Sequence, residues 1–533
     1  MAIELTDPTD TTCEPTRFWS TANIGEATPD VLSPMCWSFW GPTMEAGGRL
    51  AYFDLGILDA AETTVPTGAD NLMTAHFRGR PAMNLDLLRA WFDAMPGMTA
   101  DDFERDICGT VRDGLPPTPS RGRTAAIARK APVAMVTTHR RLQRMAAENE
   151  RWWTAEVLDG RGTADPLALL VDSADRFREA FRIHVRARLL MMSVQAQLTA
   201  LAEKAGRPEL VMAVLSGLGG VAETTVADDL WSVGHGRVTI DEFVRRHGFH
   251  GANEGNLTAV VWREDHGELE KLAAALAARP EGERPRTRET ANVAKRQHAL
   301  AELQRAVPMA RRPVARLLCR MAIRCVRDLE VGKASFLRTL DGGRFATREL
   351  GRRLVADRVL SDPDDALYLT IDEHRAGVGP EHRELVAHRR AARERHRLVE
   401  LPGTFTGTPV PIEVATASTD HGDVIEGVAG SPGIVEGLAR LVTDPNDAAP
   451  LEPGEVLVCR FTDPSWAPMF TLADALVIDI GASASHGAIV ARELGVPCVI
   501  GTNDGTRRIR TGDRLRVDGT TGRVDILERA VVS

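Results

Sequence analysis

The spacing of apolar residues changes its period along the chain, and this change predicts two kinds of fold. From Leu85 to about Leu276, apolar residues mostly recur every three or four positions, as in amphipathic helices. Residues 404–423 are rich in Thr, Pro, Gly and Val and show no helical period, and short apolar runs between glycines follow them. We therefore predict a multidomain chain with a polar tail (1–12), a mainly α domain (13–403), a linker (404–423) and a β/α domain (424–533).

Composition argues against several classes of protein. Of the 533 residues, 43% are hydrophobic and 26% are charged, and no run approaches the ~20 apolar residues of a membrane-spanning helix. The N-terminus lacks the basic and apolar regions of a secretory signal. Seven scattered cysteines without a C-x-x-C pair predict free thiols and no metal site. A net charge of −9 gives no support to nucleic-acid binding. We predict a cytoplasmic protein with no membrane or nucleic-acid partner.

Positive charge is concentrated in residues 279–358, which hold 20 Lys and Arg against 9 Asp and Glu. Within this block, arginine recurs every fourth residue on a helix predicted to start at Pro313, at Arg312, Arg316, Arg320 and Arg324. Such a stripe is either a solvated face paired with acidic neighbours or a surface that attracts anions.

The segment from Ala475 to Gly501 carries the clearest chemical signal. A predicted buried strand leads into a loop of small residues, then into a helix that begins near His486 and ends at Gly495, and a second strand follows. Ser485 is a predicted N-cap, which places His486 in the first helical turn. The positive end of the helix dipole favours a neutral imidazole and attracts an anion. A histidine that accepts a phosphoryl group needs these conditions.

This segment resembles the phosphohistidine swivelling domain of phosphoenolpyruvate synthase, pyruvate phosphate dikinase and rifampicin phosphotransferase. The resemblance covers about residues 424–529. It rests on Gly430-Ser-Pro-Gly433, Gly454-Glu-Val-Leu-Val458, Thr462-Asp-Pro-Ser-Trp466, Ser485-His-Gly-Ala-Ile-Val-Ala-Arg-Glu-Leu-Gly495 and Gly512-Asp513. The resemblance implies that His486 takes a phosphoryl group at one site and delivers it at another. It also implies that Ser485, Gly487 and Arg492 help to bind the phosphate.

Residues 17–403 resemble the substrate-binding region of the rifampicin phosphotransferases. The matching strings are Phe18-Trp-Ser-Thr-Ala-Asn-Ile-Gly-Glu26, Ser33-Pro-Met-Cys-Trp-Ser38, Arg246 to Leu257, Leu329 to Lys333 and Asp364-Asp-Ala-Leu-Tyr-Leu-Thr370. The resemblance implies that Asn23, Glu26 and Glu254 contribute to substrate binding. As alternatives, Asn23 and Glu26 are helix-cap or core residues.

Two strings depart from the family pattern. Relatives commonly carry Gly-His-Arg-Gly-x-x-Glu where this chain has Gly248-Phe-His250-Gly-Ala-Asn-Glu254, so a histidine replaces an arginine. Relatives also carry Arg-Glu-x-x-Lys, and here a leucine precedes Glu330 and Lys333. We predict that His250, Glu330 and Lys333 line the acceptor site, with Glu330 taking a hydroxyl proton and Lys333 holding phosphate oxygens. The alternative is a simple intrahelical salt bridge between Glu330 and Lys333.

Fused members of this family begin with an ATP-grasp domain, and we find no such domain and no phosphate-binding P-loop in this sequence. We therefore predict the phosphotransfer component of a split, dikinase-like system that phosphorylates an organic hydroxyl, carboxyl or enol group of a small molecule. A stand-alone ATP-grasp subunit would supply ATP and Mg²⁺, because the chain itself is expected to hold no cofactor. The alternatives are a member repurposed for dehydration or condensation, and a non-catalytic partner of an ATP-grasp protein.

Overall fold

The structure is a computed structural model. It describes residues 7–8, 10–22, 24–28, 30–95, 97–118, 122–218, 222–412, 422–442, 451–452, 454–462, 464–481 and 485–530. For Glu26, Asp106, Ala222, Glu223, residues 288–291, Pro464 and His486, only the backbone is described. Residues 1–6 and 9 of the predicted tail, residues 413–421 of the predicted linker and Asn23 lie outside the described residues.

The chain forms two compact units. Unit 1 comprises residues 1–193, 255–259 and 328–414, and unit 2 comprises residues 194–254, 260–327 and 415–533. This division differs from the predicted ranges, because it groups part of the predicted α domain with the C-terminal residues. The predicted linker also begins inside a unit, since residues 404–406 form a strand that pairs with residues 18–20 of unit 1.

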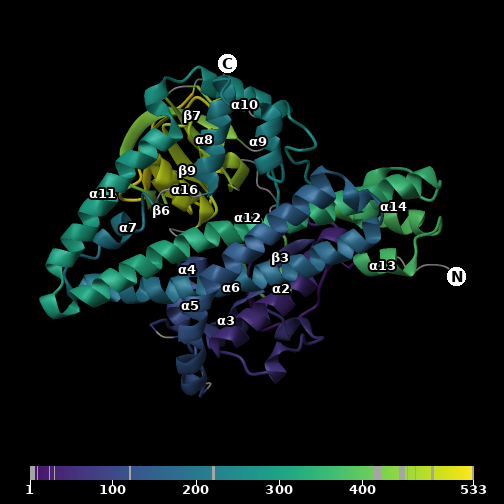
Figure 1. The fold of residues 1–533 in the computed structure, drawn as a ribbon, viewed down its shortest axis with the longest axis horizontal. Helices are drawn as coiled ribbons and strands as arrows, with labels where there is room; N and C mark the ends of the chain where they lie inside the picture. The colour runs from purple at the N-terminus through teal and green to yellow at the C-terminus, as the bar shows by residue number, and fades with distance from the viewer. Residues whose placement is uncertain are drawn as a thin grey trace. The chain divides into compact units, whose positions relative to one another are not determined.

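Unit 1 is mainly helical and holds a small sheet (Figure 1). Its helices, labelled as in Figure 1, are α1 (Ile24–Ala27), α2 (Pro34–Leu55), α3 (Leu85–Phe92), α4 (Ala100–Cys108), α5 (Thr124–Trp153), most of α6 (Pro166–Lys204), the second part of α12 (Arg312–Ala356), α13 (Ile371–Ala376) and α14 (His382–Arg397). Four strands pair in the order β2-β3-β1-β4: β1 (Phe18–Ser20), β2 (Thr74–Phe77), β3 (Arg80–Asn84) and β4 (Thr404–Thr406). The sequence reasoning had not predicted this sheet.

Local sequence explains where the helices of unit 1 begin and end. Helix α2 starts at Pro34 because the Ser33 side chain accepts a hydrogen bond from the Cys36 amide, and it ends at Gly56, whose φ of 88° lies in the left-handed region. Helix α4 begins with a capping box formed by Thr99 and Asp102.

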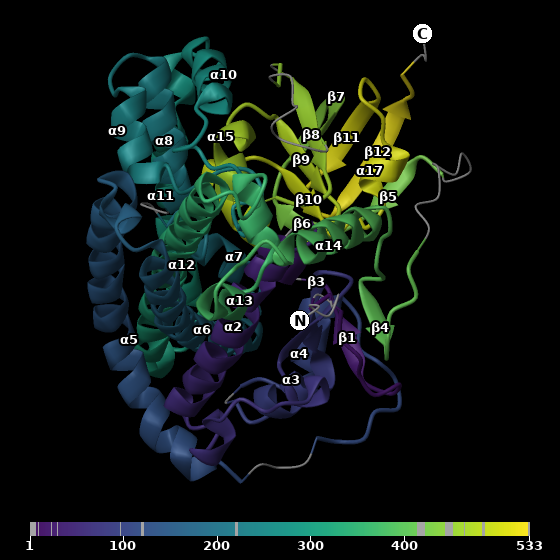
Figure 2. The ribbon, with the colours of Figure 1, turned by 90° about the vertical axis from the view of Figure 1, so that its right-hand side faces the viewer.

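Unit 2 combines helices with an eight-stranded sheet. The helices are α7 (Leu210–Val214), α8 (Ala222–Gly234), α9 (Ile240–His247), α10 (Gly267–Ala277), α11 (Pro285–Ala306), the first part of α12, α15 (Ala467–Phe470), α16 (His486–Leu494) and α17 (Gly505–Arg508). The strands are β5 (Val424–Glu426), β6 (Val428–Ser431), β7 (Ile434–Val442), β8 (Glu455–Cys459), β9 (Ala475–Ile478), β10 (Cys498–Ile500), β11 (Arg514–Asp518) and β12 (Arg523–Glu528). Their order is β5-β12-β11-β7-β8-β9-β10-β6, and Figure 2 shows most of them as neighbouring arrows. A β-sheet domain near the C-terminus was predicted, and the structure confirms it.

The centre of this sheet is parallel and buried on both faces. Strands β7, β8, β9 and β10 run parallel in that order. Alternate residues of β8 belong to different cores: Val456 and Val458 pack in one, and Leu457 and Cys459 pack in the other. This two-sided burial explains why β8 and β9 read as continuous apolar runs rather than as an alternating pattern.

One hydrophobic core joins the helices of unit 2 to the sheet. Trp231, Phe243 and Trp262 from the helical part pack in the same cluster as Phe470 and Val490 from the C-terminal part. Hydrogen bonds add to this contact, since Arg279 donates to the Leu472 carbonyl at 2.7 Å. The C-terminal β/α part therefore shares its core with helices that precede the predicted linker in sequence.

The basic stripe lies on the first part of α12. Arg316, Arg320 and Arg324 are exposed, and Arg316 donates to Gln304 at 3.0 Å. Among the described residues, no ion pair between the stripe and an acidic side chain is found, so the expectation of acidic neighbours is not met there.

None of the described helices is long and apolar enough to cross a membrane.

Candidate functional site

Helix α16 connects two parallel strands of unit 2 and begins at His486. Strand β9 leads into the loop before the helix, and β10, which follows the helix, pairs parallel with β9. The helix ends at Gly495, whose φ of 68° places it in the left-handed region that favours glycine. The predicted strand-helix-strand arrangement around His486 is therefore present. The His486 side chain itself is outside the description.

Ser485 occupies the N-cap position of α16, but its side chain does not cap the helix. Its backbone is extended, with φ −72° and ψ 162°, and its hydroxyl makes no capping hydrogen bond. The side chain is only 4% exposed, and among the described residues its Oγ has no hydrogen-bond partner. A buried hydroxyl without a partner is costly unless a ligand supplies one. The first-turn amides of a helix likewise lack intrahelical partners.

Close packing accounts for the glycine that follows His486. A Cβ atom at Gly487 would lie 2.6 Å from Thr462 Oγ1 and 3.1 Å from Ile478 Cδ1. Thr462 is itself buried, so its short side chain has little room to move. The predicted contribution of Gly487 to phosphate binding stays a prediction.

We expect Gly487→Ala to destabilise unit 2 by about 1–3 kcal/mol, the usual cost of an overpacked site. Urea denaturation followed by tryptophan fluorescence measures this loss. Gly282→Ala is the control, since nothing lies within 4 Å of its added Cβ, and it should change the free energy of unfolding little. Equal stability of the two variants would contradict the packing argument.

A buried carboxylate that the sequence reasoning missed lies at the end of β9. Asp479 accepts hydrogen bonds from the hydroxyls of Thr502, at 2.7 Å, and Thr506. Burial raises the pKa of Asp479, although these hydrogen bonds oppose the shift. The network connects β9 to the segment after β10. The sequence signal for this residue was an aspartate directly after an apolar run. A carboxylate at the end of a buried strand needs hydrogen-bond partners.

Arg492 and Glu493 connect α16 to neighbouring elements of unit 2. Arg492 donates to the Gly430 carbonyl at 2.6 Å, and burial lowers its pKa to about 10. Glu493 accepts from the Leu218 amide at 2.8 Å, and Asn292 on α11 donates to the Glu493 carbonyl at 2.8 Å. These contacts give Arg492 a structural task, and its predicted role in phosphate binding is untested.

His250 and Glu254 contact each other within unit 2. His250 Nδ1 lies 2.6 Å from Glu254 Oε2, and both side chains are buried. In this chain the glutamate of the family string therefore pairs with the histidine that replaces the family arginine.

Glu330 and Lys333 lie three residues apart on α12 in unit 1, where Glu330 is buried. The prediction that these residues share one acceptor site with His250 is untested, because they belong to different units. Glu26 lies on α1, and only its backbone is described. Among the described residues, no group of three or more His, Cys, Asp or Glu side chains is placed to hold a metal ion.

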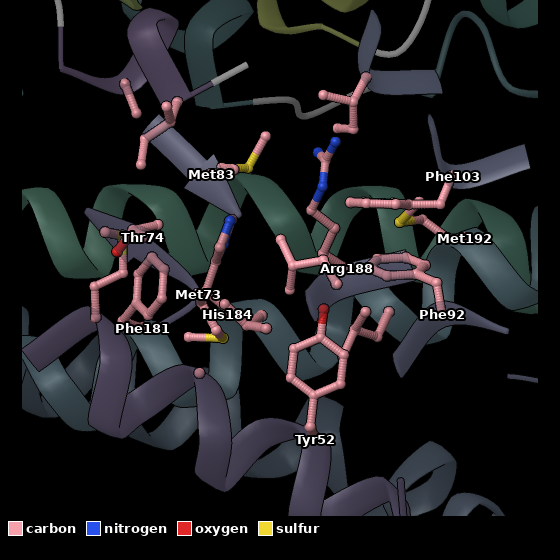
Figure 3. Close-up of a pocket in the computed structure, with 18 of the residues that line it drawn as sticks. Tyr52, Met73, Thr74, Met83, Phe92, Phe103, Phe181, His184, Arg188 and Met192 are labelled. Atoms are coloured by element: carbon pink, nitrogen blue, oxygen red, sulfur yellow. The ribbon is translucent and has the colours of Figure 1, made fainter. Parts of the chain in front are cut away.

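Unit 1 contains an apolar pocket of about 240 Å³ (Figure 3). Its wall comes from α1, α2, β2, β3, α3, α4, α6 and α12, and most lining side chains are apolar: Ile24, Ala27, Trp40, Met44, Met73, Met83, Leu88, Phe92, Phe103, Ile107, Phe181, Val185, Leu189, Met192 and Phe336. Such concave, apolar cavities with a few polar groups are where small molecules bind.

Four polar side chains line this pocket, namely Tyr52, Thr74, His184 and Arg188. Among the described residues, Thr74 Oγ1 and His184 Nδ1 are buried without a hydrogen-bond partner. Burial and the charges of Arg188 and Lys333 lower the pKa of His184 to about 3, so its imidazole is neutral at physiological pH.

His184 also connects the pocket to the predicted acceptor residues of unit 1. It hydrogen-bonds the Leu329 backbone, and Gly332 lies so close that an added Cβ would approach His184 Nδ1 to 2.9 Å. Neither Glu330 nor Lys333 lines the pocket. The sequence analysis did not single out His184. A histidine among apolar residues at helical spacing, with an arginine one helical turn later, was the missed signal.

Comparison with known proteins assigns two parts of the chain. Residues 451–522 match the mobile domain of PEP-utilising enzymes. Residues 235–330 match the fourth domain of rifampicin phosphotransferase. The resemblance predicted from the sequence is therefore confirmed, and α16 lies inside the mobile domain.

Individual relatives agree with this assignment. A rifampicin phosphotransferase from Streptomyces is 28% identical over 536 aligned residues, which cover 93% of this chain and 61% of that protein. An uncharacterised protein of Mycobacterium tuberculosis is 35% identical over 53% of this chain and 32% of its own length. A prodigiosin-synthesising transferase of Serratia marcescens is 31% identical over 53% of this chain and 33% of its own length. The chain thus spans less than two thirds of the length of these relatives.

Proposed function

We propose that this chain carries a phosphoryl group on His486 and delivers it to an oxygen atom of a small organic acceptor. The observation that carries the proposal is the start of α16 inside the mobile domain, where the buried Ser485 hydroxyl has no partner among the described residues. That hydroxyl and the free first-turn amides can hold phosphoryl oxygens beside His486. The phosphotransferase names of two relatives support the same reaction class.

The proposed cycle has two steps. In the first, a neutral ring nitrogen of His486 attacks a phosphoryl group of ATP. A P–N bond forms, the P–O bond to the rest of ATP breaks, and that remainder leaves with the bridging oxygen and the electron pair of the bond. In the second, an acceptor oxygen attacks the phosphohistidine, so that the P–N bond breaks, a P–O bond forms and any hydroxyl proton of the acceptor passes to a base or to water. The helix dipole at the start of α16 favours the neutral nucleophile and the anionic product.

We propose that an ATP-grasp protein charges His486 and supplies ATP and Mg²⁺. This proposal comes from the family resemblance. The chain would then act in a split system, in which one protein binds the nucleotide and this one carries the phosphoryl group. Its predicted cytoplasmic location agrees with a supply of ATP.

We place the acceptor in the pocket of unit 1. The pocket combines an apolar wall with two buried polar atoms, Thr74 Oγ1 and His184 Nδ1, that lack partners among the described residues. Neutral His184 can accept a hydrogen bond from an acceptor hydroxyl through Nδ1. With a volume of about 240 Å³, the cavity suits a compact acceptor, since pockets for drug-sized ligands are larger.

Phosphoryl labelling tests the proposal. We expect a label on His486 after incubation with ATP, Mg²⁺ and a candidate ATP-grasp protein, and no label with ATP and Mg²⁺ alone. His486→Ala should lose the label completely, because the nucleophile is absent. Mass spectrometry at neutral to alkaline pH, where phosphohistidine survives, locates the modified residue.

The control for this experiment is His298→Ala, since the His298 side chain is 72% exposed on α11 and lies outside the mobile domain. It should be labelled like the parent protein. Equal labelling of His486→Ala, or labelling of the parent protein at another residue, would overturn the assignment.

A second candidate is a synthetic reaction in which phosphorylation activates a substrate for condensation. The observation in its favour is the Serratia marcescens relative, which is named as a transferase that synthesises prodigiosin. Product analysis after labelling distinguishes the two, because simple transfer leaves a stable phosphorylated acceptor and condensation releases inorganic phosphate.

A further inference from the structure

The pocket of unit 1 contains one charged side chain in an otherwise uncharged wall. Arg188 is the sole Lys, Arg, Asp or Glu among the 20 described lining residues. Figure 3 shows its guanidinium among apolar side chains, with Met83 on one side and Phe103 and Met192 on the other. A cation in apolar surroundings is costly unless a negative group compensates it.

Other arginines on the same helix form ion pairs with an acidic side chain of the protein. Arg182 and Arg186 on α6 both pair with Asp54, at 2.8 and 3.3 Å. For Arg188, no ion pair or hydrogen bond occurs within the described part of the chain. Its charge still acts on the pocket. It opposes the rise in the pKa of Tyr52 that burial causes, and it adds to the fall in the pKa of His184 that burial causes.

Tyr52 supplies a second donor in the same pocket. Its side chain is buried, and burial keeps the pKa of the hydroxyl above its usual range, so the group stays protonated and can donate. Figure 3 shows the Tyr52 hydroxyl directed toward the base of the Arg188 side chain, with the guanidinium at its other end. An arginine fork matches the two oxygens of a carboxylate, and a hydroxyl donor in the same pocket can add a hydrogen bond.

We propose that this pocket binds a compact apolar carboxylic acid, whose carboxylate pairs with Arg188 and Tyr52 and whose hydrocarbon body packs on the methionine and phenylalanine side chains. The volume of about 240 Å³ fits a single ring with a short chain. An inorganic or nucleotide phosphate fits less well, because it would leave the apolar wall without a partner. The assignment of this acid as the substrate class of the phosphotransfer reaction rests on the proposed function.

Calorimetry with a matched pair of probes tests the proposal. 3-Phenylpropanoate and its neutral isostere 3-phenylpropanamide differ at the carboxylate, and a hydrogen bond to a charged group contributes about 1.5–3 kcal/mol. We therefore expect the acid to bind at least about tenfold more tightly than the amide. Arg188→Gln should remove this preference while amide binding stays unchanged. Arg188→Lys should keep a reduced preference, and Tyr52→Phe should weaken acid binding alone.

Arg178→Gln is the matched control, because Arg178 lies on the same helix, is exposed and is absent from the pocket wall. It should bind both probes like the parent protein. Equal binding of acid and amide by the parent protein, no binding of either at millimolar concentration, or an acid preference that survives in Arg188→Gln would each overturn the proposal. If Arg188→Gln does not fold, the ratio of acid affinity to amide affinity in the Arg188→Lys and Tyr52→Phe variants decides instead.

The same assay separates this inference from the proposed phosphotransfer. His486→Ala should bind 3-phenylpropanoate like the parent protein, because His486 is not part of the pocket wall. Acid binding without labelling of His486 would contradict the phosphotransfer proposal alone. Labelling of His486 without acid binding would contradict the carboxylate proposal alone.

Discussion

Replacing Asp341 with alanine should lower the free energy of unfolding of unit 1 by about 3–5 kcal/mol, the cost of leaving a buried charge without its partner. Asp341 and Arg344 lie one turn apart on α12, 2.8 Å from each other, and both side chains are fully buried. Asp341 also accepts a hydrogen bond from Trp153 Nε1 at 2.7 Å. Loss of Asp341 therefore breaks two buried contacts at once.

This network also anchors a short segment that is separated in sequence from the rest of unit 1. Arg344 donates to the Asn256 carbonyl at 3.0 Å, and Trp40 donates to the Gly255 carbonyl at 2.9 Å. Residues 255–259 directly follow the Gly248–Glu254 string that the sequence analysis singled out. We expect Asp341→Ala to increase amide exchange in residues 255–259 as well as along α12.

Urea denaturation, with hydrogen exchange read on peptides of unit 1, measures this effect. Asp341→Leu combined with Arg344→Met should lose less than the sum of the single variants, because the double variant leaves no lone buried charge. Glu148→Ala is the control, since its ion pair with Arg144 on α5 is exposed, and it should leave the free energy of unfolding almost unchanged. A strictly additive double variant would show that the two charges do not stabilise each other.

The sequence predicted the surroundings of His486 well because the signals there are local. A cap residue, a C-terminal glycine and two flanking apolar runs are each read from a few neighbouring positions. The structure confirms the resulting strand-helix-strand arrangement between Ala475 and Ile500. The predicted Ser485 cap shows the limit of this reasoning, because its backbone has the cap conformation while its hydroxyl makes no capping bond.

Features that depend on distant pairing were not predicted. Strand β4 pairs with β1 across almost four hundred residues of sequence, so no local pattern reveals the partner. The shared core of unit 2 likewise joins Trp231 to Phe470. The pocket was missed for the same reason: Tyr52 and Arg188 lie on different helices, and their common surroundings arise only from tertiary packing.

Acidification from pH 6.5 to pH 5 should lower the free energy of unfolding of unit 1 by about 3 kcal/mol through two histidines, His76 and His184. Burial lowers the pKa of His76 and of His184 to about 3. Between that pKa and the value of about 6.5 in the unfolded chain, each imidazole binds a proton in the unfolded state only. Stability from this source is therefore complete above about pH 6.5 and falls as the pH decreases, by about 1.4 kcal/mol per pH unit and histidine.

The surroundings of each histidine support this direction. His76 Nδ1 bonds Thr11 Oγ1 at 2.8 Å and its ring packs on Trp37, with the charge of Asp7 opposing the effect of burial. For His184, the positive charges of Arg188 and Lys333 act in the same direction as burial. The pKa values of His374 and His396 in unit 1 are also lowered by burial, which adds to the same trend.

The slope of stability against pH isolates the contribution of one histidine. His76→Gln should reduce that slope between pH 6 and pH 5 by up to about 1.4 kcal/mol per pH unit, whatever the substitution does to stability at neutral pH. His298→Gln should keep the parent slope, because the His298 side chain is 72% exposed and folding does not bury it. Urea titrations at several pH values give both slopes. If His76→Gln kept the parent slope, His76 would have to bind its proton equally well in the folded and unfolded chains. Burial beside Trp37 would then not lower the pKa of His76, which would contradict the prediction.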